Sequence, residues 1–504
     1  MTTRSTRRKA AAACALTALT AAGLVVPAAA SDAATKSTAI KSTATTKATT
    51  GPDWTFPANA ATVADIAKSI RADVAYQQGY TGKGVGVALI DTGVAPVQGL
   101  TSGNVVNGPD LSLESQVPAL LHTDGYGHGT HLAGIIAGRD NTDGTGFRGI
   151  APDVKLTSIK VGMSNGAVDV SQVMAALDWV VKHRNDDKAN PIKVVNLSYG
   201  TDSKLLYTSN PLAYAAENAV RAGITVVVAA GNSGKAITVP ATDTFPVVVA
   251  AEDTAGTTNP ADDTLSDFSA KDGRLVSVDI AAPGRSIVSL RDPGGFADTF
   301  YPSARVGDRY FKGSGTSQAA AVVSGAVALY LQKYPSATPT QVRFALWRSL
   351  TGVIASTPAK LDMSTLLGWT MSADMTLQPG TGTGSLQSAR GNSVVRFGDD
   401  TALTGENDIF GPFSTSKWAA ASAAGTSWNG GSWMGHPWTG TAWGTATNNQ
   451  ANWAGTTWSG RAWSGRAWSD VAWSGRAWSG GGWTGAGFSG AAWTGVSWSG
   501  ATWG

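Results

Sequence analysis

The alternation of short apolar runs with helix-length segments constrains the fold of this chain more than any other feature. Six runs rich in Val, Ile, Leu and Ala have the length of buried strands: Val85–Ile90, Lys155–Val161, Lys193–Leu197, Ile224–Ala230, Val247–Ala251 and Val276–Ala281. Helices are expected between, before and after them: Asn59–Gly79, Gly129–Gly138, Val168–His183, Pro211–Gly223, Ser317–Tyr334 and Pro339–Ser349. This order predicts an α/β fold with a mostly parallel sheet between layers of helices.

Polar side chains stand where functional groups gather in such a fold, at the carboxyl ends of the strands. Asp91 ends the first strand, Asn232 follows the strand that ends at Ala230, and His128 opens an apolar helix. Each has an ordinary interpretation on its own, as a turn residue, a left-handed turn position and a helix cap.

A stretch of small residues, Gly313–Ala321, runs directly into another apolar helix and places Ser317 at the start of that helix. Free backbone N–H groups and the positive end of the helix dipole lie at such a position, where they can stabilise an oxyanion. Gly-Ser-Gly-Thr-Ser before a helix is also an ordinary turn followed by a cap.

Taken together, these residues supply the parts of nucleophilic acyl transfer. A serine such as Ser317 is unreactive at neutral pH unless a base removes its proton, and His128 can act as that base. A carboxylate at Asp91 would hold the imidazole tautomer and stabilise the imidazolium. The amide of Asn232 and the backbone N–H of Ser317 could both face the carbonyl oxygen on which charge develops.

The segments Val87–Val94, Gly127–Gly138, Ala229–Gly234 and Gly313–Ala320 resemble the motifs of the subtilases, the subtilisin-like serine peptidases. The order Asp, His, Ser is also the order in subtilisin. The resemblance spans Tyr80–Ser349 and implies the subtilisin-like three-layer fold.

By this resemblance Asp91, His128 and Ser317 form the catalytic triad of a serine endopeptidase that acts through an acyl-enzyme, and Asn232 belongs to the oxyanion hole. The chemistry then requires no cofactor, and the substrates are polypeptides. A second histidine on the same helix, His131, is expected to be structural.

The resemblance also implies where a substrate binds. Ser198, Tyr199 and Gly200 resemble the edge to which a substrate backbone adds as a strand, and the turn at Asn165 and Gly166 resembles the opposite wall. The segments expected to line the pocket for the side chain before the cleaved bond are small and uncharged apart from the Tyr199 phenol. We therefore expect apolar or aromatic residues to be preferred there over Arg and Lys.

Three features depart from the family pattern. Gln318 and Ala321 stand where the family usually has Met and Pro, and few residues separate the export signal from Tyr80, so that a full-length folding prodomain is not evident. The loop Asp140–Gly144 lies where many relatives bind calcium, although a solvated acidic loop is the commoner structure. A structural calcium ion there is the alternative expectation, and no metal ligand is assigned.

The first 30 residues have the three parts of a secretory signal, with basic residues, an apolar run and small residues ending at Ala30. Residues 31–58 are expected to form a flexible linker or short pro-segment, and the peptidase domain to occupy residues 59–372. Removing the signal takes away four basic residues, so the net charge falls from +3 to about −1 and nucleic acid is not expected as a partner. The mature chain has no cysteine, so its core must hold it together without disulfides.

The C-terminal part contains a five-residue aromatic period. Residues 373–427 are expected to be a linker, and residues 428–504 a Gly- and Trp-rich repeat. Tryptophan occupies positions 428, 433, 438, 443, 453, 458, 463, 468, 473, 478, 483, 493, 498 and 503. The rings fit a stacked repeat core, an exposed ladder that contacts the cell wall or envelope, or a disordered tail.

Two other functions remain open beside the secreted peptidase. The fold could be a catalytically idle subtilase scaffold, although the complete set of Asp91, His128, Ser317 and Asn232 argues against that. The chain could also be an envelope-binding or structural protein in which the Trp repeat is the main functional part.

Overall fold

The structure is a computed structural model that describes residues 60–270, 278–348, 360–369, 377–391, 393–395, 402–438 and 458–459. The expected signal peptide at 1–30 and linker at 31–58 lie outside these residues. So do the Trp-repeat units beyond residue 438, apart from the backbone of 458–459.

A mostly parallel sheet organises the chain, as the apolar runs predict. It has eight strands in the order β3-β4-β2-β5-β6-β7-β8, with β9 also paired to β7, and only the β7–β8 pair is antiparallel. The strands are β2 (Gly86–Asp91), β3 (Val105–Asp110), β4 (Lys155–Lys160), β5 (Ile192–Leu197), β6 (Thr225–Ala229), β7 (Val247–Asp253), β8 (Thr264–Leu265) and β9 (Ile280–Pro283). The predicted α/β class is thereby confirmed.

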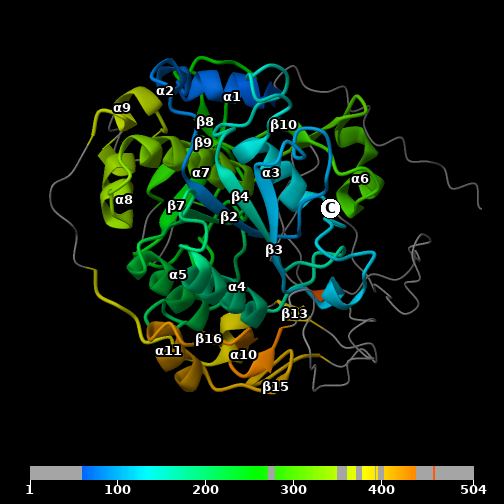
Figure 1. The fold of residues 1–504 in the computed structure, drawn as a ribbon, viewed down its shortest axis with the longest axis vertical. Coiled ribbons are helices and arrows are strands. Elements are labelled where there is room, and N and C mark those ends of the chain that lie inside the picture. The colour runs from blue at the N-terminus through cyan, green and yellow to red at the C-terminus, as the bar shows by residue number, and fades with distance from the viewer. Residues whose placement is uncertain are drawn as a thin grey trace, which may run out of the picture. The chain divides into compact units, whose positions relative to one another are not determined.

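Helices cover both faces of this sheet (Figure 1), with α3 and α7 on one face and α4 and α5 on the other. The larger helices are α3 (His128–Ala137), α4 (Val170–His183), α5 (Pro211–Arg221), α7 (Thr316–Lys333) and α8 (Pro339–Arg348). Successive side chains of β2 alternate between the two layers, since Val87 and Leu89 belong to one apolar core and Ala88 and Ile90 to the other. Both faces are buried, which explains why the strands read as continuous apolar runs.

The predicted single helix over Asn59–Gly79 is wrong in detail. The described residues form β1 (Ala61–Thr62), α1 (Val63–Ser69) and α2 (Asp73–Gln77). Thr62 caps α1 through a capping box with Asp65, so the helix begins only at Val63. Arg71 has a φ of 58°, in the left-handed region, which separates α1 from α2.

Several short elements carry no periodic apolar signal and were not predicted. Strand β3 contains Asn, Gly and Pro and lies at the edge of the sheet, where one side needs no pairing partner. A small second sheet joins β1 to β10 (Ile287–Leu290), β12 (Tyr310–Gly313) and β11 (Arg305–Val306). The short helical turns are η1 (Leu113–Gln116), α6 (Phe296–Phe300), η2 (Pro302–Ala304) and α9 (Met363–Leu366).

The described part of the expected linker over residues 373–427 is packed structure, and this prediction needs correction. It forms α10 (Leu386–Arg390) and α11 (Thr415–Ala423), which lie beyond α4 and α5 in Figure 1. Leu386 and Trp418 are fully buried in the same core as α4 and α5. The sequence did not predict this burial because the segments that form α10 and α11 contain few apolar residues, and only a few of their side chains reach the core.

The first Trp positions of the repeat also pack against α4. Trp428 and Trp433 face each other across β16 (Trp428–Asn429) and β17 (Ser432–Trp433), and both rings are buried. The remaining short strands are β13 (Val394–Val395), β14 (Asn407–Asp408), β15 (Gly411–Pro412), β18 (His436–Pro437) and β19 (Trp458–Ser459). The first two ring positions of the repeat therefore act as core residues.

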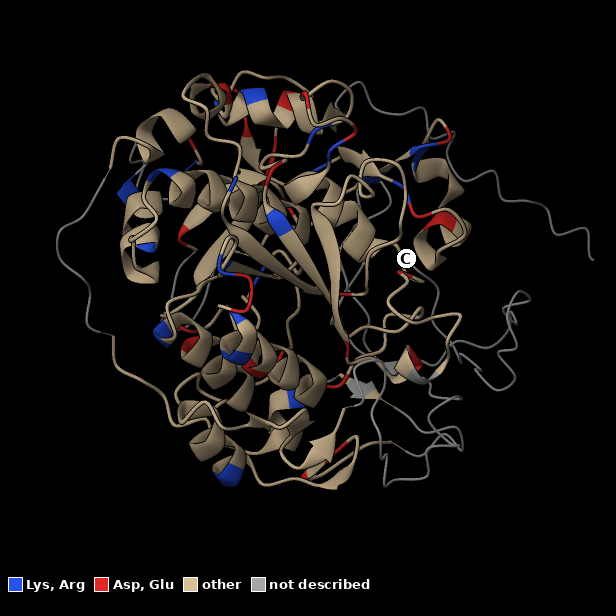
Figure 2. Ribbon diagram, in the orientation of Figure 1, with Lys and Arg blue, Asp and Glu red and all other residues tan. Residues whose placement is uncertain are grey.

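Charged side chains are interspersed over the described elements, with Lys and Arg next to Asp and Glu rather than in a stripe of one sign (Figure 2). This distribution gives no continuous basic path of the kind that follows a phosphate backbone. Within the described residues, the helices are too short or too polar to cross a bilayer.

Candidate active site

Asp91 and His128 lie in direct contact. Asp91 ends β2 at the carboxyl edge of the sheet, and His128 is the first residue of α3. The His128 Nδ1 lies 2.8 Å from Asp91 Oδ1 and 3.0 Å from Oδ2. Both side chains are buried, with exposed fractions of 0% and 1% for His128 and Asp91. Burial raises the pKa of Asp91, and the neighbouring His128 opposes that shift.

Gly129 allows this close approach of α3 to β2. A Cβ atom at that position would lie 2.1 Å from the carbonyl oxygen of Gly93 and 3.2 Å from Asp91 Oδ1. Any side chain at residue 129 would therefore push the first turn of α3 away from the Asp91 carboxylate. The Gly-His-Gly sequence is thus explained by packing as well as by chemistry.

Asp124 is a positioning group that the sequence analysis missed. Its carboxylate accepts hydrogen bonds from the backbone N–H groups of Gly127 (2.7 Å) and Thr130 (2.7 Å) at the N-terminal turn of α3. It also accepts one from Thr92 Oγ1 at 2.8 Å, which ties the turn after Asp91 to the same helix. An acidic residue shortly before a predicted helix was the available signal, because carboxylates cap helix N-termini.

Ser317 lies in the first turn of α7, which follows β12 and packs against α3. The backbone carbonyl oxygen of Ser317 accepts a hydrogen bond from Ser198 Oγ at 3.3 Å, which links it to the segment after β5. This hydrogen bond brings Ser198 and Ser317, two predicted site residues that are far apart in the sequence, into contact.

Two N–H groups converge on the space beside Gly315. The Oδ1 of Asn232 accepts hydrogen bonds from Thr316 N (2.8 Å) and Thr316 Oγ1 (3.0 Å), which orients the side-chain amide. A Cβ atom on Gly315 would lie 3.5 Å from Asn232 Nδ2 and 3.6 Å from the backbone nitrogen of Ser317. Because residue 315 is a glycine, no side chain separates Asn232 Nδ2 from the backbone nitrogen of Ser317, although Gln318 Oε1 also lies close to this position.

If Asn232 belongs to an oxyanion hole as the resemblance implies, an Asn232→Leu substitution is expected to lower kcat for peptide hydrolysis by about 10²–10³-fold with little change in KM, the usual cost of removing one such donor. The reason is that an amide in this role would act on charge that is present only in the transition state. Steady-state kinetics on a chromogenic peptide measures both constants. A variant that raises KM and leaves kcat unchanged would assign Asn232 to ground-state binding instead.

The second histidine, His131, is built into the framework. Its Nε2 lies 3.2 Å from the carbonyl oxygen of Ile287 and 3.1 Å from that of Phe311. Burial lowers the pKa of His131 to about 3, so the ring is neutral and donates from Nε2 to these acceptors. It joins α3 to β10 and β12, consistent with the structural role expected for it.

The proposed substrate-binding residues lie on loops that follow neighbours of β2. Strands β4 and β5 pair with β2 on its two sides, so the loops after them flank the Asp91 end of the sheet. Asn165 and Gly166 follow β4, and Ser198, Tyr199 and Gly200 follow β5. Tyr199 is buried rather than presented to solvent.

The side-chain amide of Gln318 is buried beside Ser317. Among the described residues, neither its Nε2 nor its Oε1 has a hydrogen-bond partner. The Oε1 atom would lie 2.7 Å from a Cβ atom on Gly315, so the Gln318 amide lies close to the same position as the Asn232 amide.

The acidic loop at Asp140 does not fit a calcium site. Asp140 forms an ion pair with Arg309 and accepts a hydrogen bond from the backbone N–H of Phe147 at 2.8 Å. Asp143 is exposed and accepts hydrogen bonds from Thr145. The described residues contain no group of three or more His, Cys, Asp or Glu suited to a metal ion. The Arg309 guanidinium takes the place that a cation would need at Asp140.

A buried carboxyl group lies beside the N-terminal turn of α3. Asp292 is 9% exposed, and its Oδ2 has no hydrogen-bond partner among the described residues. Its Cβ would lie 3.7 Å from a Cβ atom on Gly127. Burial, with Asp124 and Asp298 nearby, raises the pKa of Asp292 from 3.8 to about 9.

An Asp292→Asn substitution is expected to stabilise the folded protein by roughly 1–3 kcal/mol at pH 8 and by less at pH 5. Between pH 3.8 and about 9 the native state holds a proton that the unfolded chain has released, so stability falls as the pH rises through this window. Urea unfolding at both pH values, in a Ser317→Ala background that prevents self-digestion, measures the difference. An equal effect at the two pH values would contradict this account.

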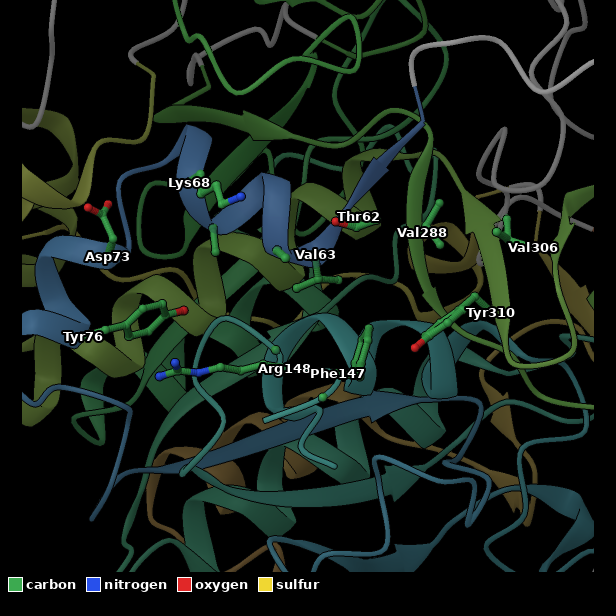
Figure 3. A pocket seen from close by; sticks show the side chains of 14 residues that line it. Thr62, Val63, Lys68, Asp73, Tyr76, Phe147, Arg148, Val288, Val306 and Tyr310 are labelled. Carbon is green, nitrogen blue, oxygen red and sulfur yellow. The ribbon is translucent and has the colours of Figure 1, made fainter. Parts of the chain in front are cut away.

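A separate cavity of about 550 Å³ lies beside α1 and is lined by residues such as Val63, Phe147, Arg148 and Tyr310 (Figure 3). The Arg148 guanidinium carbon lies 3.9 Å from the centre of the Tyr76 ring. None of the site residues described above lines this cavity.

Comparison with known proteins identifies the domain. The family model described as the subtilase family, Peptidase S8, matches residues 82–384. This chain belongs to the subtilase family.

Three curated bacterial relatives match this subtilase over a similar stretch. It is 36% identical to serine protease AprX of Bacillus subtilis over 292 residues, which are 56% of this chain and 64% of AprX. It is 36% identical to subtilisin DY of Bacillus licheniformis over 290 residues, 56% of this chain and 90% of that protein. It is 32% identical to the minor extracellular protease Epr of Bacillus subtilis over 282 residues, 54% of this chain and 36% of Epr. The shared domain is that of subtilisin-like serine endopeptidases, which are hydrolases.

Proposed function

We propose that this subtilase is a secreted endopeptidase that cleaves polypeptides through an acyl-enzyme formed on Ser317. The observation that carries the proposal is the buried contact between His128 Nδ1 and the Asp91 carboxylate. In a Ser-His-Asp triad the carboxylate binds one ring nitrogen of the histidine, and the other ring nitrogen acts as the base on the serine hydroxyl. The N–H groups beside Gly315 supply the matching site for the oxyanion.

Each residue has a defined step in this mechanism. His128 takes the proton of Ser317 as the hydroxyl attacks the scissile carbonyl, and later gives that proton to the leaving amine. Asp91 holds the imidazole and stabilises its charged form. Asn232 and the Ser317 N–H stabilise the tetrahedral oxyanion, and a water molecule then hydrolyses the acyl-enzyme by the same route in reverse order.

The substrate backbone is proposed to add as a strand between the Ser198–Gly200 segment and the turn at Asn165 and Gly166. The small, uncharged composition of the segments near Ser198 and Ala229 supports a preference for apolar or aromatic side chains before the cleaved bond. A peptide-library cleavage profile tests this preference. A profile dominated by Arg and Lys would reject it.

Hydrolysis of an unfolded protein by the full chain, together with labelling by a fluorophosphonate, tests the proposed reaction. Cleavage with the label mapped to Ser317 by mass spectrometry is the expected result. Labelling without cleavage would indicate a competent site with narrow specificity. The absence of both would favour the idle-scaffold alternative.

Export is part of the proposal and is supported by the signal-like sequence of residues 1–30 and by an extracellular relative. Contact with the cell envelope through the Trp repeat is a further proposal. Since Trp428 and Trp433 are buried, such contact would depend on units beyond residue 438. Deletion of residues 439–504 should then reduce binding to isolated cell walls, and unchanged binding would reject the idea.

A further inference from the structure

Helix α10 joins the two loops that flank the proposed active site. It comprises Leu386–Arg390 and begins just after residue 384, where the match to the family model ends. The loops that follow β4 and β5 belong to the matched region, and α10 contacts both of them. The contacts are hydrogen bonds and an ion pair, so they have defined geometry.

On the β4 side, Arg390 reaches Asp169. Its Nε lies 2.6 Å from Asp169 Oδ1 and its Nη2 lies 3.3 Å from Oδ2, and both side chains are 1% exposed. Asp169 is the N-cap of α4 and accepts a hydrogen bond from Ser171 N at 3.0 Å. The ion pair therefore holds the end of the loop that contains Asn165 and Gly166.

The other end of this loop is held separately. Glu114 Oε1 accepts a hydrogen bond from Ser164 N at 2.7 Å, and Glu114 also forms a buried ion pair with Lys160 at the end of β4. Within the loop, Gly166 N donates to the carbonyl oxygen of Met163 at 2.8 Å. The loop that contains Asn165 and Gly166 is thus held at one end by Glu114 and at the other end by the Asp169–Arg390 pair.

On the β5 side, α10 holds the segment that continues from Ser198–Gly200. The backbone carbonyl oxygen of Ala389 accepts a hydrogen bond from Thr201 Oγ1 at 2.7 Å, and that of Ser388 accepts one from Ser203 Oγ at 2.6 Å. Ala389 and Arg390 are consecutive, so the same turn of helix touches both loops.

Tyr199 connects this framework to the proposed substrate-binding edge. Its side chain is buried at 1% exposure, with the charges of Asp169 and Arg390 nearby. Burial raises the pKa of the Tyr199 hydroxyl, Asp169 adds to the shift and Arg390 opposes it. The middle residue of the Ser198–Gly200 segment is therefore buried within the electrostatic influence of the ion pair.

Arg390 is itself fixed by the C-terminal part of the chain. Its Nη1 donates to the carbonyl oxygen of Gly405 at 2.9 Å, and its Nη2 donates to that of Asn407. Every arm of the guanidinium fork is used, and a planar fork of this kind holds its partners in one orientation.

We propose that Arg390 is a positioning residue for substrate binding, which sets the separation between the β4 and β5 walls of the substrate channel from outside the family domain. This inference rests on the proposed function, because it takes those two loops as the walls. Strands on either side of β2 lie about 10 Å apart, so a shift of either loop changes the fit of an extended peptide between them. The reacting groups on Asp91, His128 and Ser317 are not touched by Arg390.

The test compares an extended peptide, which lies against both walls, with a single-residue ester, which is too short to span from the β4 wall to the β5 wall. Arg390→Met is expected to raise KM for an extended peptide by roughly tenfold with kcat changed far less, since misplacement by about 1 Å can cost up to 10²-fold. Hydrolysis of a single-residue ester, and the rate of fluorophosphonate labelling of Ser317, should stay within about twofold of wild type. Lys417→Met, an exposed change in α11, is the matched control and should alter neither constant.

Binding of the same peptide to the Ser317→Ala protein, with and without Arg390→Met, separates this inference from the proposed function. If the chain with Ser317 intact does not hydrolyse peptides, the proposed reaction is rejected. If Arg390→Met still weakens peptide binding to the Ser317→Ala protein, the positioning role is kept. Unchanged KM and unchanged binding would overturn the positioning role, as would a loss of ester hydrolysis equal to the loss of peptide hydrolysis. If Arg390→Met does not fold, Arg390→Lys tests the positioning role in the same assays, because lysine keeps the positive charge but lacks the planar guanidinium group.

Discussion

Replacing Ser317 with alanine is expected to lower kcat for peptide hydrolysis by about 10⁶-fold, and His128→Ala to cost about as much, a scale measured on subtilisin itself. The double variant should lose no more than either single one, because an unactivated serine and an imidazole without its nucleophile are equally ineffective. Residual activity then comes from the oxyanion site and substrate binding alone.

Steady-state kinetics of the two single variants and the double variant measure this non-additivity. The Ser303→Ala protein is a control, since Ser303 is an exposed serine in η2. Peptide binding to the Ser317→Ala protein should be retained, which shows that the fold and the walls are intact. Losses that simply add in the double variant would show that Ser317 and His128 act independently, against the proposed mechanism.

Replacing Asp178 with leucine is expected to destabilise the protein by about 3–5 kcal/mol, since each buried donor left without an acceptor costs roughly 1–3 kcal/mol. The Asp178 carboxylate accepts hydrogen bonds from Trp418 Nε1 (2.9 Å), Trp433 Nε1 (2.9 Å) and Ser422 Oγ (2.5 Å). Burial raises the pKa of Asp178, and these donors oppose the shift. One side chain of α4 thus anchors two elements of the C-terminal part, α11 and β17.

Urea unfolding in the Ser317→Ala background measures this loss without self-digestion. Asp178→Asn should cost less than the leucine variant, because its amide oxygen can still accept from one or two donors. Asp186→Leu, at a residue whose side chain is 70% exposed, is the control and should change stability by less than about 0.5 kcal/mol. A loss for Asp178→Leu no larger than for this control would show that the C-terminal part is not anchored at Asp178.

These hydrogen bonds make the described C-terminal part a packed portion of the folded domain, not a linker. Residues 377–391 and 402–438 cover apolar surface of α4 and α5 that would otherwise face water. Trp428 Nε1 donates to the carbonyl oxygen of Ala175 at 2.8 Å, so even the start of the Trp period is bonded to α4. The unit that folds therefore extends beyond residue 384, where the family match ends.

The central strands of the sheet and the larger helices could be predicted from the amino-acid sequence, whereas the end strands β3 and β8 could not. The candidate site residues could be named from their motifs, and their catalytic roles stay predictions. Strands buried on both faces must be apolar throughout, and helices that pack on them must be amphipathic or apolar, so these elements leave local patterns. Asp91, His128, Asn232 and Ser317 stand in short motifs with unusual glycine content, because the backbone approaches closely there. Gly129 and Gly315 are the clearest cases, since a Cβ atom would meet neighbouring atoms at both.

Tertiary structure alone decided the roles of the residues far from those motifs. Nothing local marks Arg390 or Asp178 as buried: each is a single charged residue whose cost of burial is offset by partners more than 200 residues away in sequence. The same holds for Arg309 at the acidic loop, where an ion pair at Asp140 stands in place of an expected cation site. Periodicity records which face of an element is apolar, whereas long-range polar pairing depends on which elements meet, and that is settled only when the chain packs.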